Sequence, residues 1–426
     1  MDEMLRILLR GFILLVVGVV IIGWAQKASA NPGNTITVTT QDDELNSDGD
    51  CSLREAIKAA NENIGVSGCP AGSAGLDTIN IPTGTYTLTI TGTDNYSGDL
   101  DVLESVEIIG AGSDSTTING NQIDRVFHIS SASVDVVVTI KDVTVRNGKV
   151  DNTATGGAGI LVQGTKSTLY LQNSIIKENQ ANFLGGGNTT VGGGLDNYRA
   201  KMVITNSTIA NNSADRGGGI YTDGNTEIYQ SLIYGNSARD GGGGIDSGGF
   251  NGTTTLVNVT VSNNTAPSGA GIFNDITISL LNVTLVYNGL SSTGAGLSSN
   301  AGVATLKNSI VAFNSNDGAT NCSGAITSQG YNLENAVTCG FTQTGDQQNV
   351  ITPFMDENLQ DNGGFTWTHA LLPGSPAIDA GNNTGCPSVD QRGVTRPLDG
   401  NQDGTPVCDI GAYEAPIVLY LPIIAK

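Results

Sequence analysis

The stretch Asn206–Ile220 reads NSTIANNSADRGGGI, and it decides the fold because close relatives of it recur along the chain. The next copies begin at Gln230 (QSLIYGNSARDGGGGI), Asn258 (NVTVSNNTAPSGAGI) and Asn282 (NVTLVYNGLSSTGAGL). Aligned on the first residue, the equivalent positions are Asp142, Asn173, Asn206, Gln230, Asn258, Asn282 and Asn308, with steps of 24 to 33 residues. A period in this range indicates a stacked, repetitive architecture.

Each repeat carries short strand signals bounded by glycine and asparagine, for example LYLQNSIIKEN from Leu169, and leaves no room for a helix. A unit of this length fits one circuit of a solenoid, in which successive circuits pair as parallel strands about 4.8 Å apart. We therefore predict an all-β parallel β-helix with like residues in columns. Isoleucine and valine would stack inside, turn asparagines would form an amide ladder, and glycine would supply the bends.

Charged residues test this register. Counted from Ser213 and Ser237, Asp215 falls over Arg239, and Arg216 falls over Asp240. Both couples have opposite charge, which favours ion pairs between neighbouring circuits. The other interpretation is an arginine–aspartate cluster that binds a sugar or an acid.

Both open ends of such a solenoid need a cover. Ser52-Leu53-Arg54-Glu55 is a capping-box pattern, and it opens the helical run LREAIKAANEN with apolar residues on one face. We expect this amphipathic helix, beside Cys51, to cover the first circuit. The repeat fades after about Asn321, and the cysteine-containing tail that follows is expected to close the other end.

The chain begins with an export signal. Arg6 and Arg10 precede the apolar run GFILLVVGVVIIGWA, and Ala28-Ser29-Ala30 follows, which is typical of a cleaved secretory signal. The alternative is that the run stays uncleaved as a membrane anchor, although it is short for a span.

Six cysteines form three local couples, Cys51 with Cys69, Cys322 with Cys339, and Cys386 with Cys408. An even number in an exported chain favours disulfides, which we expect within each couple. A zinc site is the alternative, but there is no CxxC and there are only two histidines.

Composition limits the partners. The formal net charge is −21, which argues against nucleic acid or an anionic membrane surface. Contact with a membrane is expected only through the N-terminal segment or the C-terminal tail. Within the fold, a glycan or a cell-surface protein remains as the expected partner.

Three stretches resemble known families. CSLREAIKAANEN, after TITVTTQDDELNSDGD, resembles the CSLREA domain of exported bacterial proteins. HALLPGSPAIDAGNN, DQRGVTRPLDGNQDG and CDIGAYE resemble the choice-of-anchor Q domain, and the NNSADRGGGI units resemble polymorphic outer-membrane protein repeats and right-handed parallel β-helix coils. The resemblance implies an exported or surface-attached right-handed β-helix and carries no catalytic assignment.

These observations divide the chain into five parts. They are a signal peptide (1–30), a CSLREA cap (31–96), β-helix repeats (97–320), a closing module similar to choice-of-anchor Q (321–415), and a tail (416–426) that is either a sorting segment or a last edge strand.

Catalytic motifs are sparse. GxSxG, HExxH and P-loop patterns do not occur. Hydrolases and lyases on β-helices need paired carboxylates, or acidic calcium ligands with a basic residue. Asp99 and Asp101 share one strand face, and Asp124 and Arg125 follow about one coil later, so these four residues are the candidate catalytic set. His128 is expected at a surface or turn position, and His369 in the closing module.

A calcium site is also predicted. Asp399, Asn401 and Asp403 follow the D-x-N-x-D-G order of a calcium loop, with Asp409 or Glu414 as a further ligand. A second, vaguer loop contains Asp48 and Asp50, with Asp42 and Asp43 nearby. The alternative for both is an aspartate-rich turn.

Taken together, the sequence favours a secreted or cell-surface β-helix with a structural, adhesive or glycan-binding role and no catalysis. The alternative is a polysaccharide lyase or glycoside hydrolase acting in a groove on the β-helix.

Overall fold

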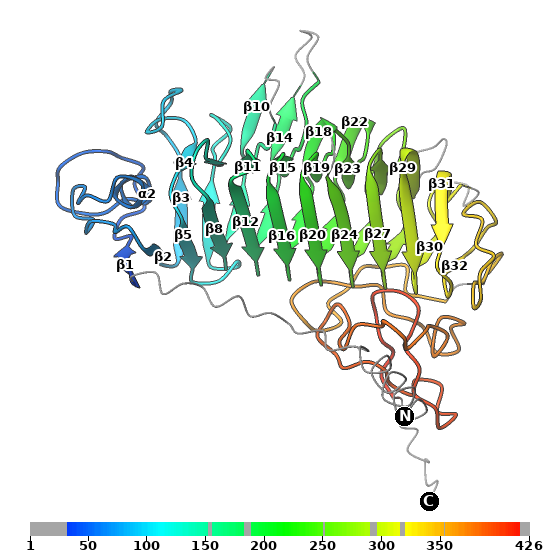
Figure 1. Cartoon of the computed structure of the whole chain (residues 1–426). Coiled ribbons are helices and arrows are strands. Elements are labelled where there is room, and N and C mark those ends of the chain that lie inside the picture. The colour runs from blue at the N-terminus through cyan, green and yellow to red at the C-terminus, as the bar shows by residue number, and fades with distance from the viewer. Residues whose placement is uncertain are drawn as a thin grey trace, which may run out of the picture.

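The computed structural model describes residues 32–151, 156–182, 189–249, 252–289, 296–315, 320–352 and 354–417. The described chain forms a right-handed parallel β-helix, one long coil with a helix at its start and an irregular module at its end (Figure 1). The predicted fold is confirmed. The predicted signal peptide (1–30) and most of the tail lie outside the described residues.

Two faces of the coil belong to one 18-stranded sheet because the long strand β29 (Leu297–Lys307) pairs with β26 (Ile272–Asn274) on one face and with β27 (Thr277–Leu281) on the other. Its strands are β1 (Pro32–Thr37), β2 (Leu76–Ile81), β4 (Leu100–Val102), β5 (Val106–Gly110), β7 (Phe127–Ser130), β8 (Val136–Lys141), β11 (Ile160–Gln163), β12 (Ser167–Gln172), β15 (Leu195–Tyr198), β16 (Lys201–Thr205), β19 (Ile220–Thr222), β20 (Asn225–Tyr229), β23 (Ile245–Ser247), β24 (Thr253–Val257), β26 (Ile272–Asn274), β27 (Thr277–Leu281), β29 (Leu297–Lys307) and β31 (Cys322–Ser328).

The third face is a ten-stranded sheet, and a four-stranded sheet lies beside it. The ten strands are β3 (Gly84–Thr87), β6 (Thr116–Asn119), β9 (Thr144–Arg146), β13 (Ile175–Lys177), β17 (Thr208–Ala210), β21 (Leu232–Tyr234), β25 (Thr260–Ser262), β28 (Thr284–Val286), β30 (Ile310–Ala312) and β32 (Leu333–Glu334). The four are β10 (Lys149–Asp151), β14 (Gln180–Asn182), β18 (Ser213–Arg216) and β22 (Ser237–Gly241).

The predicted columns are confirmed by the register of the ten-stranded sheet. Ile175 pairs with Thr208, and the same column runs from Thr144 to Ile310, two residues after each aligned position. All seven aligned residues have positive φ, between 48° and 59°. Their shared left-handed turn explains why the position selects Asn and Asp, which tolerate this conformation better than most residues.

The continuous amide ladder lies six residues after the aligned positions. Asn179, Asn212, Asn236, Asn264, Asn288 and Asn314 are each at most 1% exposed, and each side-chain amide donates to the next residue's Oδ1 up to Asn321 at 2.9–3.2 Å. At the aligned turn positions, side-chain links of this kind join Asn173 to Asp142 and Asn308 to Asn282.

One of the two stacked ion pairs is confirmed. Arg239 lies 3.2 Å from Asp215. The couple of Arg216 with Asp240 is wrong, because the register shifts between Ala214 and Arg216 and sets Arg216 against Gly241. Arg216 instead binds Asp246 through two hydrogen bonds of 2.8 and 3.0 Å.

The capping helix α2 (Leu53–Glu62) has the predicted capping box: Ser52 Oγ accepts from the Glu55 amide, and Glu55 accepts from the Ser52 amide. Its buried face packs on β1, β2 and β4, which covers the first circuits. No helix among the described residues is both long and apolar enough to cross a membrane. The three predicted disulfides are present, as is typical of proteins from oxidising compartments.

The closing module does more than end the coil. Strands β31 and β32 still pair with the coil, and the chain after them lies against its side (Figure 1). Val286, Ile310 and Leu333, on β28, β30 and β32, form a buried cluster with Phe354, Met355, Ile410 and other residues of the module. The module therefore covers the ten-stranded sheet near its C-terminal end and leaves its middle strands open.

Candidate functional site

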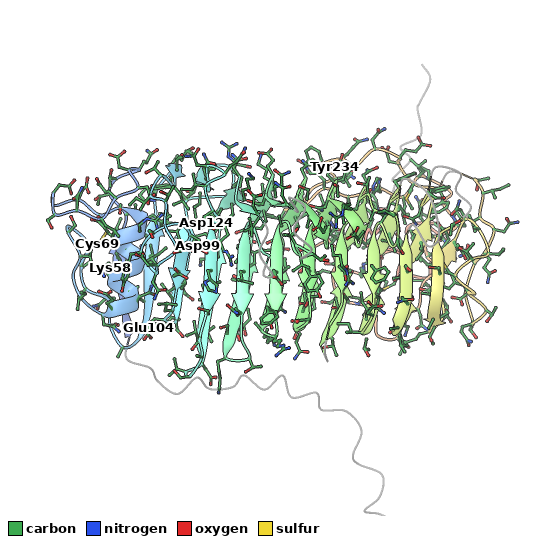
Figure 2. The ribbon with its side chains drawn as sticks, turned by 90° about the horizontal axis from the view of Figure 1, so that it is seen from above. Lys58, Cys69, Asp99, Glu104, Asp124 and Tyr234 are labelled. Carbon is green, nitrogen blue, oxygen red and sulfur yellow. A yellow bond between two sulfur atoms is a disulfide. The ribbon has the colours of Figure 1, made fainter. Side chains whose placement is uncertain are left out.

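The four predicted catalytic residues lie together in the first circuits of the coil, where Figure 2 labels Asp99 and Asp124. Arg125 Nε lies 2.9 Å from Asp99 Oδ2, and Asp124 packs against Gly98. Burial raises the pKa of Asp99 to about 6, although Arg125 lowers it, while Asp101 and Asp124 add to the rise. A carboxyl group with such a pKa can exchange a proton near neutral pH.

His128 joins this group, which the sequence did not predict. His128 stacks on Asp101 in the pairing of β7 with β4, and its Nδ1 donates to Asp101 Oδ1 at 2.8 Å. Its Nε2 lies 3.0 Å from Gln163 Oε1 on β11. One ligand atom from each of Asp99, Asp101 and His128 lies within 4.8 Å of the others. The signal that could have found it was the coil register, which places residue 128 directly above residue 101.

Ion pairs and burial close the cluster to solvent. The side chains of Asp99, Asp101 and Arg125 are 15%, 8% and 11% exposed, and His128 is 23% exposed. Arg54 of the capping helix binds the adjacent backbone through Gly98 O and Asp99 O. These partners hold the charges in fixed positions and leave little of them exposed to a polymer.

The predicted calcium loop is a tight, exposed turn. Asp399 Oδ1 and Oδ2 accept from the amides of Asp403 and Gly404, and Asn401 Oδ1 also accepts from Asp403. Asp409, by contrast, is buried. Its carboxylate accepts from the Asp379 and Ala415 amides and is not part of the exposed turn. Calcium binding here stays a prediction.

In the second acidic loop, the residues that come together differ in part from those predicted. Asp48 and Asp50 lie with Glu44, with one ligand atom from each within 4.8 Å of the others. Asp43 instead forms an ion pair with Arg54 at 2.6 Å.

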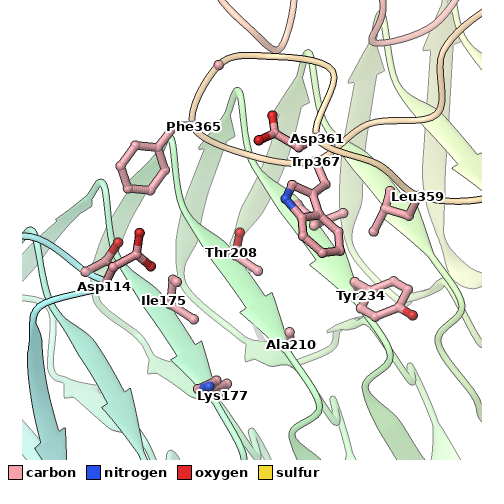
Figure 3. A pocket seen from close by; sticks show the side chains of 13 residues that line it. Asp114, Ile175, Lys177, Thr208, Ala210, Tyr234, Leu359, Asp361, Phe365 and Trp367 are labelled. Carbon is pink, nitrogen blue, oxygen red and sulfur yellow. The ribbon is translucent and has the colours of Figure 1, made fainter.

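A groove on the ten-stranded sheet is a further candidate site, and sequence reasoning missed it. Its cavity volume is about 490 Å³. The floor is the outer face of β13, β17 and β21, and one wall is the loop 359–367 of the closing module (Figure 3). We call this site the aromatic groove; its lining includes Asp114, Ile175, Lys177, Thr208, Ala210, Leu232, Tyr234, Leu359, Asp361, Phe365 and Trp367.

Aromatic side chains project into the groove without being buried. Phe365 is 42% exposed and Trp367 is 53% exposed. Figure 3 shows both rings on the loop that also carries Asp361, facing the strand residues Thr208 and Ala210. Large exposed aromatic side chains beside a cavity mark a binding surface.

The aromatic wall is anchored to the coil by buried polar contacts. Gln391 accepts from Thr260 Oγ1 on β25 and donates to Thr366 Oγ1 and Trp367 O. His369, 2% exposed, has its Nε2 2.9 Å from Ser262 Oγ, also on β25. Phe365 and Trp367 are therefore presented by a backbone that is fixed before any ligand arrives.

Comparison with known proteins gives little beyond architecture. No protein-family model matches the chain, and no curated protein matches it. Among solved structures, the chain is similar to the crystal structure of pectate lyase Pel9A, with 13% sequence identity and a TM-score of 0.46, over 90% of this chain and 96% of that chain. A similarity at this level carries no functional assignment.

Proposed function

We propose that this protein is an exported, surface-associated β-helix that binds a glycan in the aromatic groove and does not cleave it. The observation that carries the proposal is the pair of exposed rings, Phe365 and Trp367, held over a flat strand surface. A sugar ring has apolar C–H faces and a polar hydroxyl edge. It therefore suits a site with aromatic surface on one side and scattered polar groups at the edges.

The floor of the groove suits an extended ligand. Thr208, Ala210 and Leu232 are small or apolar outward residues on successive parallel strands, so the surface repeats about every 4.8 Å along the coil. A polymer can lie over Thr208 and Ala210 on β17, with the larger side chains of the neighbouring strands β13 and β21 on either side. The rigid coil adds little ordering cost on binding.

Export and surface attachment belong to the same proposal. The motifs that resemble CSLREA and choice-of-anchor Q domains support it, as do the three disulfides, which suit an oxidising environment. We assign residues 31–96 to the cap and residues 321–415 to the closing module. Attachment would use the N-terminal segment or the C-terminal tail.

The test uses an unusual property of the sequence. The chain has two tryptophans, Trp24 and Trp367, so a chain that starts after residue 30 has Trp367 alone. A glycan array run on this chain identifies binders, and titration of the best binder should change the fluorescence of this single tryptophan. Phe365→Ala should weaken binding by about tenfold or more, because a stacked ring contributes on the order of 1 kcal/mol or more.

Ile351→Ala is the matched control, because Ile351 is also an exposed apolar residue of the closing module, at 74% exposure, and does not line the groove. It should bind like the unmodified chain. Absence of any glycan binding, or an equal loss of affinity in both variants, would contradict the proposal.

A second candidate function is cleavage of a polysaccharide at the Asp99 cluster. It is favoured by the convergence of Asp99, Arg125 and His128, which gives a proton-exchanging carboxyl group beside a cation. Incubation with pectin, alginate and neutral glycans would reveal unsaturated products or new reducing ends. If products form, Asp99→Asn should abolish them while Phe365→Ala reduces them only through binding; absence of products leaves the non-catalytic function.

A further inference from the structure

We infer that the aromatic groove selects polysaccharides that contain amino sugars over those that contain uronic acids. The inference rests on the proposed function, and it names the class of glycan. It comes from the placement of charge around the two rings.

Carboxylates are the exposed charges at the aromatic wall; the cation Arg392, which donates to Asn362 O of the same loop at 3.3 Å, has a side chain only 7% exposed and is bound to Asp390 at 2.7 Å. Asp361 lies on the same loop as Trp367, and Asp114 lines the same groove from the coil (Figure 3). Both residues are exposed, and neither forms an ion pair with another described residue. Asp361 Oδ1 accepts from the Gly363 amide at 3.0 Å, which fixes the carboxylate at the rim.

Lys177 is the cation among the described residues that line the groove, and it has a carboxylate neighbour. Its Nζ lies 3.7 Å from Glu178 Oε1, and Arg146, the neighbour of Lys177 in the strand pairing, lies 3.9 Å from the same carboxylate. In Figure 3, Lys177 lies at the far end of the strand floor from Phe365 and Trp367. A uronate stacked on the rings would therefore lie near two exposed carboxylates, while the cation next to the loop, Arg392, is buried and already bound to Asp390.

A carboxylate accepts hydrogen bonds and cannot donate them while it is ionised. The ligand groups that satisfy Asp114 and Asp361 are therefore donors. The hydroxyl groups of any sugar can donate as well, so the group that distinguishes an amino sugar is its ammonium, which forms the stronger, charge-assisted hydrogen bond. The net charge of −21 repels a polyuronate further.

Four probes of matched length separate the classes in the single-tryptophan titration. They are a deacetylated chito-oligosaccharide, its N-acetylated form, a cello-oligosaccharide without nitrogen, and an oligogalacturonate. We expect the deacetylated probe to bind at least about tenfold more tightly than the cello-oligosaccharide and the oligogalacturonate to bind most weakly. The double variant Asp114→Asn/Asp361→Asn should lose this preference and keep its affinity for the cello-oligosaccharide.

A charge-matched control separates the groove from the general acidity of the protein. Glu104→Gln/Asp135→Asn removes two exposed carboxylates that do not line the groove, and Glu104 lies on the opposite edge of the coil from Tyr234 in Figure 2. This control should keep the preference for the deacetylated probe.

Equal binding of all probes, tightest binding of oligogalacturonate, or equal loss in both double variants would overturn this inference and leave glycan binding itself intact. Failure of every glycan to bind would overturn the proposed function instead.

Discussion

Asn236 Nδ2 donates to Asn264 Oδ1 at 2.9 Å, and the Asn236 backbone amide donates to the same oxygen at 2.9 Å. The same two bonds recur at each step of the ladder, so every Oδ1 accepts twice from the preceding circuit. Nδ2 of Asn236 also donates to Ile209 O. One side chain therefore satisfies backbone groups that the turn would otherwise leave buried without a partner.

The substitution Asn236→Ala should lower the free energy of unfolding by about 3 kcal/mol, because it leaves buried donors and acceptors unpaired on two neighbouring circuits. Urea denaturation followed by circular dichroism measures it. Asn95→Ala, at an exposed loop position, is the control and should be neutral. Equal effects of the two substitutions would show that the ladder does not stabilise the coil.

The coil could be predicted from the sequence because the residues of the left-handed turns recur at a spacing that equals the length of one circuit. The ladder column was not predictable in the same way. In Asn211-Asn212 the two residues look alike, yet Asn211 has φ of 55° while the side chain of Asn212 is buried in the coil. Which of the two asparagines joins the ladder depends on which one follows the left-handed turn residue, and the sequence does not show this. The misplaced partner of Arg216 has a related cause: the copy Gln230–Ile245 is one residue longer than Asn206–Ile220, and the sequence does not say where along the strand the extra residue is accommodated.

The two candidate sites differ more strongly in how far they could be predicted from the sequence. Asp99 and Arg125 could be grouped because they are one circuit apart, and the coil register carries that information. Phe365 and Trp367 reach β17 and β21 only because the closing module turns back along the coil. No repeat period links the module to those strands, so the aromatic groove could be found only from the structure.

Asp196 should make stability depend on pH. Burial raises its pKa to about 7 from an ordinary value of 3.8, and its Oδ1 has no hydrogen-bond partner among the described residues. Between about pH 4 and 7 the folded chain therefore holds a proton at Asp196 that the unfolded chain has released. Unfolding then releases a proton, so stability falls as pH rises through this window.

The substitution Asp196→Asn removes this contribution. Chemical denaturation at several pH values should show a shallower decline in the variant, with a difference in slope of at most about 1.4 kcal/mol per pH unit between pH 4 and 7. Because burial also raises the pKa of Asp246 to about 7, part of the decline should remain. Asp135→Asn, at a carboxylate that is 77% exposed, should leave the slope unchanged. Parallel curves for the unmodified chain and Asp196→Asn would contradict the assignment.

Calcium should raise the melting temperature if the loop at Asp399 binds it. Asp399, Asn401 and Asp403 already lie in one tight turn, and their oxygens are the hard ligands that calcium prefers. Melting in calcium and in chelator should differ, and Asp403→Ala should remove the difference. Asp48→Ala is the parallel variant for the group of Glu44, Asp48 and Asp50. If only Asp48→Ala removes the difference in melting temperature, calcium binds in the cap instead. Identical melting temperatures in calcium and in chelator would exclude both loops.

Arg396 should control how the closing module docks on the coil. It is 5% exposed, it donates to Asp409 O and Gly411 O, and it lies 3.5 Å from Glu414. The same two carbonyl oxygens accept from Asn282 of the coil, so Arg396 fixes the segment by which the module is attached. Removal of the guanidinium leaves Glu414 buried without its cation and two carbonyl oxygens without this donor, a loss that typically costs about 3–5 kcal/mol.

The module should therefore loosen in Arg396→Met while the coil, which has its own core and ladder, persists. Heating the variant should give two transitions where the unmodified chain gives one, and limited proteolysis should cut after residue 352 before it cuts the repeats. Lys307→Met is the control, because Lys307 also donates to the module, at Thr384 O, from an exposed position. Because the aromatic wall belongs to the module, Arg396→Met should also weaken glycan binding. A single transition with unchanged binding would show that Arg396 does not hold the two parts together.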